Sequence, residues 1–136
     1  MKKSLLAGWV TCVLLAATSA FAHHSPVMFD RSKKQTITGT VKEFSWVNPH
    51  ASIQLEVVNA QGATEVWGVE MNSPNNLVKQ GWKSTILKGG DKVSIVVNPL
   101  RTGEHGGSFV SIKLPDGRVL GDKWTEDIES KGVVGK

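Results

Sequence analysis

Hydrophobic and polar residues alternate through most of residues 35–120. The alternation is clearest at Ile53, Leu55 and Val57, which are separated by Gln54 and Glu56. A period of two is typical of β-strands that bury one face. The pattern predicts five strands and one short further strand, near residues 35–46, 52–57, 64–71, 93–97, 110–114 and 118–120.

The first predicted strand contains a break in this alternation. Ile37 and Val41 share one face, whereas Phe44 and Trp46 continue that face one residue out of step. A β-bulge produces such a shift, and bulges bend and coil a strand. Gly39 lies on the inner face and would ease the same bend. We therefore expect a long, curved first strand.

A helix signal lies between the third and fourth strands. Ser73 suits the N-cap, Pro74 suits the first helical position and Gly81 suits the C′ position. Leu77 and Val78 are predicted to face inward. Three strands, a short helix and further strands follow the order of the OB-fold. We predict an all-β domain with one short helix, folded as a small OB-fold-like Greek-key β-barrel. The alternatives are an open sandwich and another small barrel.

The N-terminus has the features of an export signal. A basic start, Met1-Lys2-Lys3, precedes an apolar run that ends in Ala20-Phe21-Ala22. This arrangement is typical of a secretory signal peptide, and the run is too short for a membrane span. We predict cleavage between Ala22 and His23 and a soluble periplasmic product. A retained N-terminal anchor is the alternative.

The sequence divides into four predicted segments: a signal peptide at 1–22, an extended N-terminal arm at 23–34, an OB-like β-barrel domain at 35–121 and a flexible charged tail at 122–136. Cleavage removes Cys12, the only cysteine, so no disulfide is available to the exported chain. It also lowers the formal net charge from +4 to +2. This balance does not favour nucleic-acid binding. No later apolar run is long enough to span a membrane.

Catalytic motifs are absent from the sequence, which has no Gly-x-Ser-x-Gly, phosphate loop or His-Glu-x-x-His. The glycine-rich residues 102–107 are interpreted as a flexible hairpin loop. Trp46, Trp67 and Trp82 fall at inward or element-end positions, which favours core packing. We therefore expect a binding protein rather than an enzyme. The outward face of the second and third strands has no aromatic ring for stacking bases; it holds Ser52, Gln54, Glu56, Val66, Gly68 and Glu70.

The histidines carry the sharpest chemical signal. If cleavage leaves His23 at the start, its α-amine and its ring can chelate one metal ion. A further imidazole from His24 or His50 would complete a three-nitrogen set, which favours copper. His105 and Glu70 are weaker candidate ligands. The alternative is that the histidine pair is incidental to processing, that the arm is disordered, and that His50 only hydrogen-bonds its turn.

Several short motifs together resemble a family of small exported Gram-negative bacterial proteins, catalogued as domain of unknown function 6152. The resemblance covers about residues 23–120 and implies an exported, compact β-barrel-like domain, without an activity, a cofactor or a catalytic residue. Its most specific part is Trp46-Val47-Asn48-Pro49-His50. The other motifs are His23-His24-Ser25, Phe29-Asp30, Thr38-Gly39-Thr40-Val41, Trp67-Gly68-Val69-Glu70, Gly81-Trp82, Leu87-Lys88-Gly89-Gly90-Asp91 and Leu114-Pro115-Asp116-Gly117.

Two functions are the leading interpretations of these patterns, and an enzyme with copper–oxygen chemistry at the N-terminal histidine is a third. The first is a periplasmic OB-like module that binds copper, or another transition metal, through the processed N-terminal histidine. The second is a metal-free module that packs against a periplasmic or envelope protein through an outward patch bearing Val66.

Overall fold

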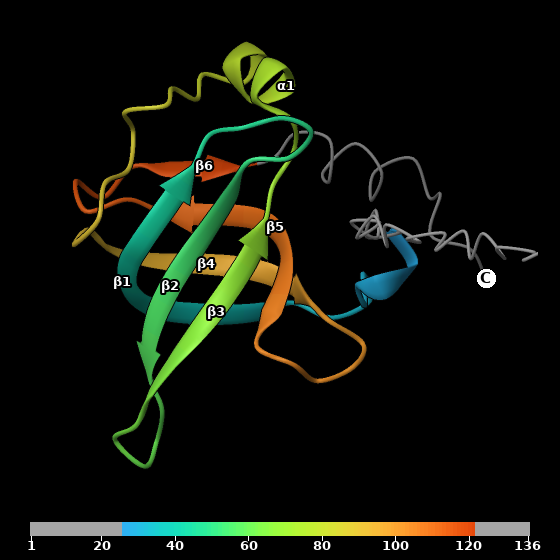
Figure 1. Cartoon of the computed structure of the whole chain (residues 1–136), viewed down its shortest axis with the longest axis vertical. Coiled ribbons are helices and arrows are strands. Elements are labelled where there is room, and N and C mark those ends of the chain that lie inside the picture. Colours follow the sequence, from blue (N-terminus) through green and yellow to red (C-terminus); the bar gives the residue numbers. More distant parts are fainter. Residues whose placement is uncertain (1–25, 122–136) are drawn as a thin grey trace, which may run out of the picture.

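The computed structural model describes residues 26–121. The predictions for residues 1–22, 23–25 and 122–136 lie outside this range. The described chain contains six β-strands, one α-helix and one 3-10 turn (Figure 1). Their bounds are η1 (Pro26–Met28), β1 (Gln35–Ser45), β2 (Ser52–Val58), β3 (Thr64–Glu70), α1 (Pro74–Lys79), β4 (Lys92–Pro99), β5 (Gly106–Lys113) and β6 (Val119–Gly121).

The strands form one sheet that closes on itself. Their order is β3-β2-β1-β4-β5-β6, and β3 also pairs with β5. The β3–β5 pairing is parallel, whereas the other strand pairs are antiparallel. Closure through β3 and β5 makes a five-stranded mixed barrel, with β6 added beside β5. This is the topology of an OB-fold, so the predicted fold class is confirmed and the open sandwich is excluded.

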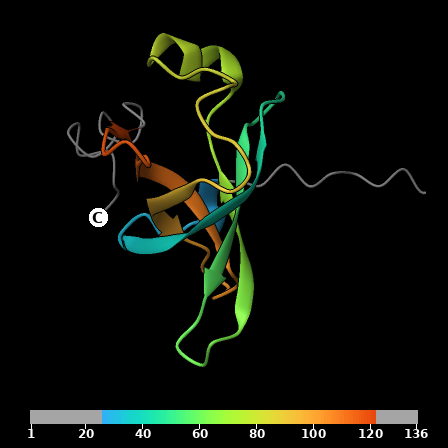
Figure 2. The ribbon, with the colours of Figure 1, turned by 90° about the vertical axis from the view of Figure 1, so that its left-hand side faces the viewer.

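Strand β1 bends between its two partners, as Figures 1 and 2 show. Its first half pairs with β4 and its second half with β2. Val41 lies opposite Leu55 and Glu43 opposite Gln54, so the register shifts between them. The predicted bulge is therefore confirmed. At Gly39, a Cβ atom would collide with the backbone carbonyl of Glu56, so the bend brings the two backbones too close for any side chain.

Helix α1 covers one end of the barrel (Figure 1). Leu77 is fully buried, and Trp82 just after the helix is also buried. Gly81 has a φ of +91°, and its N–H donates to the Val78 carbonyl at 3.1 Å, as expected for the predicted C′ position. The prediction for Val78 is wrong, because its side chain is 59% exposed. A helix of six residues packs along a single stripe, and the residue after Leu77 lies off that stripe.

A second bulge corrects the predicted face of β5. Val96 lies opposite Ser111, whereas Val97 lies opposite Phe109, so Val110 is the additional residue. Phe109 is consequently buried in the core where the simple alternation predicted Val110. Its ring meets that of Trp82 edge to face, with the centroids 5.4 Å apart.

The glycine-rich residues are not simply a flexible loop, which corrects that prediction. Gly106 and Gly107 are buried and begin β5, where they lie opposite Gly68 and Val69 of β3. A Cβ at Gly107 would lie 2.7 Å from the Asn98 carbonyl oxygen. The two glycines therefore permit the close approach that closes the barrel.

Candidate functional site

A groove of about 780 Å³ lies against the outer face of β2 and β3. The loop between β1 and β2 borders it, as do residues from the N-terminal arm and from the end of β4. This face and these loops are where OB-folds bind their ligands. The lining residues are Phe29, Val47, Asn48, Pro49, His50, Ser52, Ile53, Gln54, Gly68, Val69, Glu70, Leu100 and Gly107.

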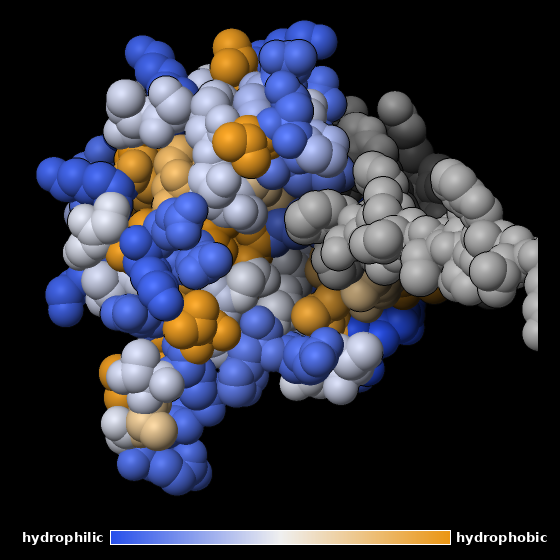
Figure 3. All heavy atoms as spheres, viewed as in Figure 1, coloured by the Kyte–Doolittle hydropathy of each residue, from blue (hydrophilic) through white to orange (hydrophobic). Residues whose placement is uncertain are grey.

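The face of the barrel seen in Figure 3 carries hydrophobic residues as separate spots among hydrophilic ones. The groove combines both kinds. Phe29, Val47 and Leu100 provide apolar surface, whereas Ser52 and Gln54 provide polar groups from β2. The alternation along β2 therefore predicted the outward position of its polar groove residues. The apolar side of the groove was missed, because Phe29 and Leu100 are distant in sequence from β2.

Gly68 keeps the floor of the groove open. It lies opposite Gln54 in the β2–β3 pairing, and a Cβ added at Gly68 would meet no atom within 4 Å. Glycine is not required there by the fold, unlike Gly107. Its small size leaves space between the rims of the groove.

His50 is held at the rim of the groove by an extension of the β2–β3 pairing. The backbone N–H of Ala51 donates to Asn72, and that of Met71 donates to Ala51. This places the His50 ring beside the Met71 carbonyl, with Nδ1 at 3.0 Å from the oxygen. A carbonyl only accepts hydrogen bonds, so Nδ1 carries the hydrogen and neutral His50 has its lone pair on Nε2.

Glu70 lies on the Nδ1 side of the His50 ring. Its Oε1 is 4.0 Å from Nδ1, and the two side chains are 26% and 50% exposed, respectively. The structure thus brings together two of the residues that the sequence singled out. A carboxylate in this position can help to orient the ring. Glu70 therefore fits the role of a supporting group better than the role of a metal ligand.

His105 belongs to a different cluster. Its Nε2 is 3.4 Å from Oε2 of Glu65, and its ring stacks on Trp67 with the centroids 5.2 Å apart. Its backbone carbonyl accepts a hydrogen bond from Gly68. Glu70 lies five positions after Glu65, which corresponds to about 16 Å along the strand. His105 is therefore not a partner for His50; it lies at the end of the loop that precedes β5.

Within residues 26–121, no group of three or more His, Cys, Asp or Glu side chains is arranged to hold a metal ion. His50 with Glu70 is therefore an incomplete site as far as these residues go. His23 and His24 lie outside the described residues. In the described chain, no helix is long and apolar enough to cross a membrane.

The barrel topology defines an OB-fold-like domain that carries a groove over β2 and β3. The chain belongs to the Family of unknown function (DUF6152), whose model matches residues 10–109. No curated protein matches the sequence. Among solved structures, the chain is similar to the mitochondrial single-stranded DNA binding protein Rim1 from S. cerevisiae, with a TM-score of 0.44 and 12% identity. The match covers 66% of this chain and 96% of that one.

Proposed function

We propose that this protein is an exported, periplasmic OB-fold binding module that binds a transition metal ion, with copper preferred, at the His50 end of its groove. The proposed ligands are Nε2 of His50 and the α-amine and ring of His23, with His24 as a further donor. The observation that carries the proposal is the hydrogen bond from Nδ1 of His50 to Met71.

This hydrogen bond matters because of how histidine ligands work in metal sites. A metal-binding histidine usually donates its second ring N–H to a carbonyl or carboxylate, which sets the tautomer and the ring orientation. His50 meets this requirement through Met71 and has Glu70 nearby. A set of nitrogen ligands favours Cu²⁺ over the other divalent first-row metals.

The N-terminal arm supports a contribution from His23. Phe29 lines the same groove as His50. His23 lies six positions before Phe29, and an extended chain of that length spans up to about 20 Å. The terminus that processing would create is therefore within reach of the groove.

Nucleic acid is not the proposed ligand. Affinity for nucleic acid comes largely from Lys and Arg side chains that neutralise phosphates. The residues that line the groove include neither Lys nor Arg, and the lining residue with a carboxylate, Glu70, would repel a phosphate.

The test uses protein exported by a bacterial host and purified from its periplasm. Mass spectrometry should find His23 as the first residue. Cu²⁺ titration then compares this protein with His23→Ala and with a form that carries one extra glycine before His23, which displaces the α-amine. We expect both changes to weaken Cu²⁺ binding at least about ten-fold, because each removes part of the chelate. Equal affinity in all three forms contradicts the metal site, as does a mature chain that begins elsewhere.

A metal-free interaction module is the second proposal. Val47 on the rim of the groove is 58% exposed, and Val66 on the same sheet face is 45% exposed. Exposed apolar side chains beside a groove are suited to a partner protein in the periplasm or envelope. Val47→Asp should abolish capture of a defined partner in the presence of a chelator, whereas Val119→Asp, at an exposed valine on β6, should not.

A further inference from the structure

Glu70 gives the groove a partly buried carboxylate. It lies directly opposite Ser52 in the β2–β3 pairing, and its side chain is 26% exposed. The residues that line the groove include neither Lys nor Arg. Within residues 26–121, no lysine or arginine forms an ion pair with Glu70. This part of the chain therefore leaves the negative charge of the groove without a basic side chain to balance it.

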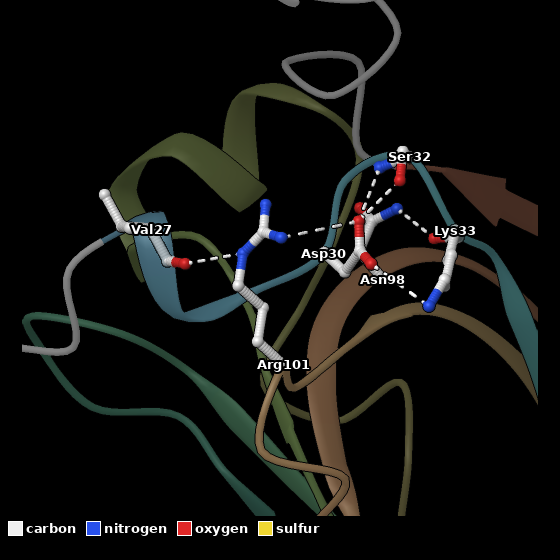
Figure 4. Close-up of polar contacts among 6 residues, drawn as sticks. All are labelled: Val27, Asp30, Ser32, Lys33, Asn98 and Arg101. Atoms are coloured by element: carbon white, nitrogen blue, oxygen red, sulfur yellow. Dashed lines mark hydrogen bonds and ion pairs between the residues drawn. The ribbon is translucent and has the colours of Figure 1, made fainter.

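Asp30 is a carboxylate with the opposite surroundings (Figure 4). Its Oδ1 accepts hydrogen bonds from the hydroxyl and the N–H of Ser32, at 2.6 and 3.2 Å. Nζ of Lys33 and one terminal nitrogen of Arg101 lie 3.4 and 3.9 Å from its carboxylate oxygens. The Ser32 hydroxyl is the main reason that the pKa of Asp30 lies below its usual value. The charge of Asp30 is thus balanced within the chain, whereas that of Glu70 is not.

His50 is the titratable neighbour of Glu70, and in its neutral form it does not satisfy the carboxylate. Nδ1 of His50 lies 3.0 Å from the Met71 carbonyl oxygen, so the hydrogen on Nδ1 is directed to that carbonyl. The distance from Nδ1 to Oε1 of Glu70 is 4.0 Å, which is too long for a hydrogen bond. The carboxylate of Glu70 therefore keeps its capacity to accept hydrogen bonds from a ligand.

The other polar side chains of the groove suit an ammonium group. An alkylammonium ion has three N–H donors and no acceptor. Acceptor oxygens are available on Glu70, on the hydroxyl of Ser52 opposite it, and on the amide of Gln54 two residues further along β2. An anionic ligand would instead meet the carboxylate and be repelled.

Apolar surface completes the groove around these acceptors. Val47, from the loop between β1 and β2, is 58% exposed. Phe29 forms an isolated antiparallel bridge with Leu100, and both residues line the groove, so the arm is fixed as part of the wall. A Cβ at Gly68 would meet no atom within 4 Å, which leaves open space on the face that carries Glu70.

We propose that this groove binds a small organic ammonium ion with a compact apolar body, and that Glu70 holds its charge. A partly buried carboxylate without a cation has lost hydration that a bound ammonium group restores as a charge-assisted hydrogen bond. The apolar body covers Val47 and Leu100. A volume of about 780 Å³ matches pockets for ligands of drug-like size. Metal binding at His50 is not needed for this site.

The first experiment compares three ligands that share a phenyl body and differ in charge: phenethylamine, phenethyl alcohol and hydrocinnamate. Calorimetric titration at pH 8 with a chelator present keeps free imidazole neutral and the alkylamine protonated. Phenethylamine should bind about ten-fold more tightly than the alcohol, because its hydrogen bond to the carboxylate is charge-assisted. Hydrocinnamate should bind most weakly. Equal affinities for the three ligands, or no binding of the amine, overturns the proposal.

The second experiment changes the carboxylate. Glu70→Gln keeps the size of the side chain and removes its charge, so the affinity for phenethylamine should fall about ten-fold while that for the alcohol stays within about two-fold. Glu56→Gln is the matched control, because Glu56 is exposed on the same face, opposite Val66, and does not line the groove. Urea unfolding shows whether each barrel is intact. An unchanged preference for the amine in Glu70→Gln, or an equal loss in Glu56→Gln, contradicts the proposal.

Amide NMR signals locate the bound amine. Phenethylamine should shift the signals of Val47, Gly68 and Glu70, and shifts confined to residues outside the groove overturn the site. The chelator keeps this test separate from the metal site. Copper binding without a preference for the amine refutes the ammonium site alone, whereas a preference for the amine without copper binding refutes the metal site alone.

Discussion

A glutamate at each end of β3 faces a histidine from another segment: Glu70 faces His50, and Glu65 faces His105. The two histidines differ in the contacts of their rings. The side chains of His50 and His105 are 50% and 46% exposed, so exposure does not distinguish them. His50 uses Nδ1 to bond a backbone carbonyl and has its lone pair on Nε2. His105 directs Nε2 at Glu65 and stacks its ring on Trp67.

The difference shows how surroundings assign a role to a histidine. His105 packs where β3 and β5 come together, and its backbone carbonyl bonds Gly68. Its contacts serve the closure of the barrel. His50 lies beside the groove at Gly68, and its bond to Met71 leaves the lone pair on Nε2, which is the arrangement that the proposed metal site requires.

The largest difference between the two histidines is expected when each imidazole is removed in turn. His50→Ala should weaken Cu²⁺ binding by more than about a hundred-fold, because the loss of a ligand should exceed the roughly 10–100-fold effect of losing a supporting group. His105→Ala should leave the affinity within about two-fold, since its ring is engaged elsewhere. Competition titration against a chelator of known affinity measures both. Equal losses in the two variants would show that the assignment is wrong.

Alanine substitutions at Gly107 and Gly68, in the paired strands β5 and β3, should change the free energy of unfolding in opposite directions. Gly107→Ala should lower the free energy of unfolding by about 2 kcal/mol, because its Cβ would meet the Asn98 carbonyl and Val97. Gly68→Ala should raise it by about 0.5 kcal/mol, since a Cβ there meets open space and alanine loses less entropy on folding.

Urea unfolding measures both glycine variants. A larger substitution, Gly68→Leu, should fold normally but fill the groove and weaken Cu²⁺ binding. Val66→Leu adds bulk on the same face outside the groove and serves as the control. If both leucine variants bind alike, the groove is not the binding site.

A smaller effect on stability should distinguish the contribution of the aromatic ring of His105 from that of its nitrogen atoms. His105→Ala should destabilise the protein by about 1 kcal/mol through loss of the stack on Trp67. His105→Phe should recover most of this stability, because the aromatic surface remains. His50→Phe, in contrast, should not recover copper binding. Unfolding curves combined with acrylamide quenching of tryptophan fluorescence follow these changes. A His105→Phe variant as unstable as the alanine variant would assign the stability to Glu65 pairing instead.

The smallest expected effect concerns the pH dependence of the turn at Asp30, whose Oδ1 accepts hydrogen bonds from Ser32. Hydrogen bonds lower the pKa of Asp30 in the folded state, chiefly that from Ser32, so its ionised form stabilises the fold. This contribution is present above the unfolded pKa of about 3.9 and is lost as the pH falls through the lower folded value. Amide exchange of residues 27–34 should therefore accelerate only in strong acid, and Asp30→Asn should remove that dependence.

Asp116 provides the comparison for the acid experiment. Its pKa is also lowered, mainly by the backbone N–H of Arg118. Asp116→Asn should change the acid response of its own hairpin and leave the exchange of residues 27–34 as it was. Acid-dependent exchange of the arm that persists in Asp30→Asn would mean that another group controls it.

Much of the barrel was predictable because it depends on local alternation. The period of two located the strands, the shift after Val41 located the first bulge, and Gly81 located the end of α1. The errors arose where the position of a residue depends on pairing with a strand that is distant in sequence. Val110 was assigned inward because the second bulge depends on pairing with β4. The buried role of Gly106 and Gly107 depends on how closely β5 approaches β3.

The sequence predicted individual residues of the candidate site but not which of them lie together. Parity along β2 and β3 placed Ser52, Gln54 and Glu70 on the outer face. The pairing of His50 with Glu70, and of His105 with Glu65, follows from strand register across the barrel. The hydrogen bond from Arg101 to the Val27 carbonyl joins residues 74 positions apart, so no local pattern indicated it.

The sequence alone determined the barrel class, the kind of strand at each place and the residues able to bind a metal, because these depend on side-chain chemistry and on periods of a few residues. Tertiary structure decided that β3 closes against β5 and which carboxylate faces each histidine. It also decided that the arm is held against the groove. These are contacts between segments that are distant in sequence. They form only where the backbone register and the space left by glycine allow the segments to approach each other.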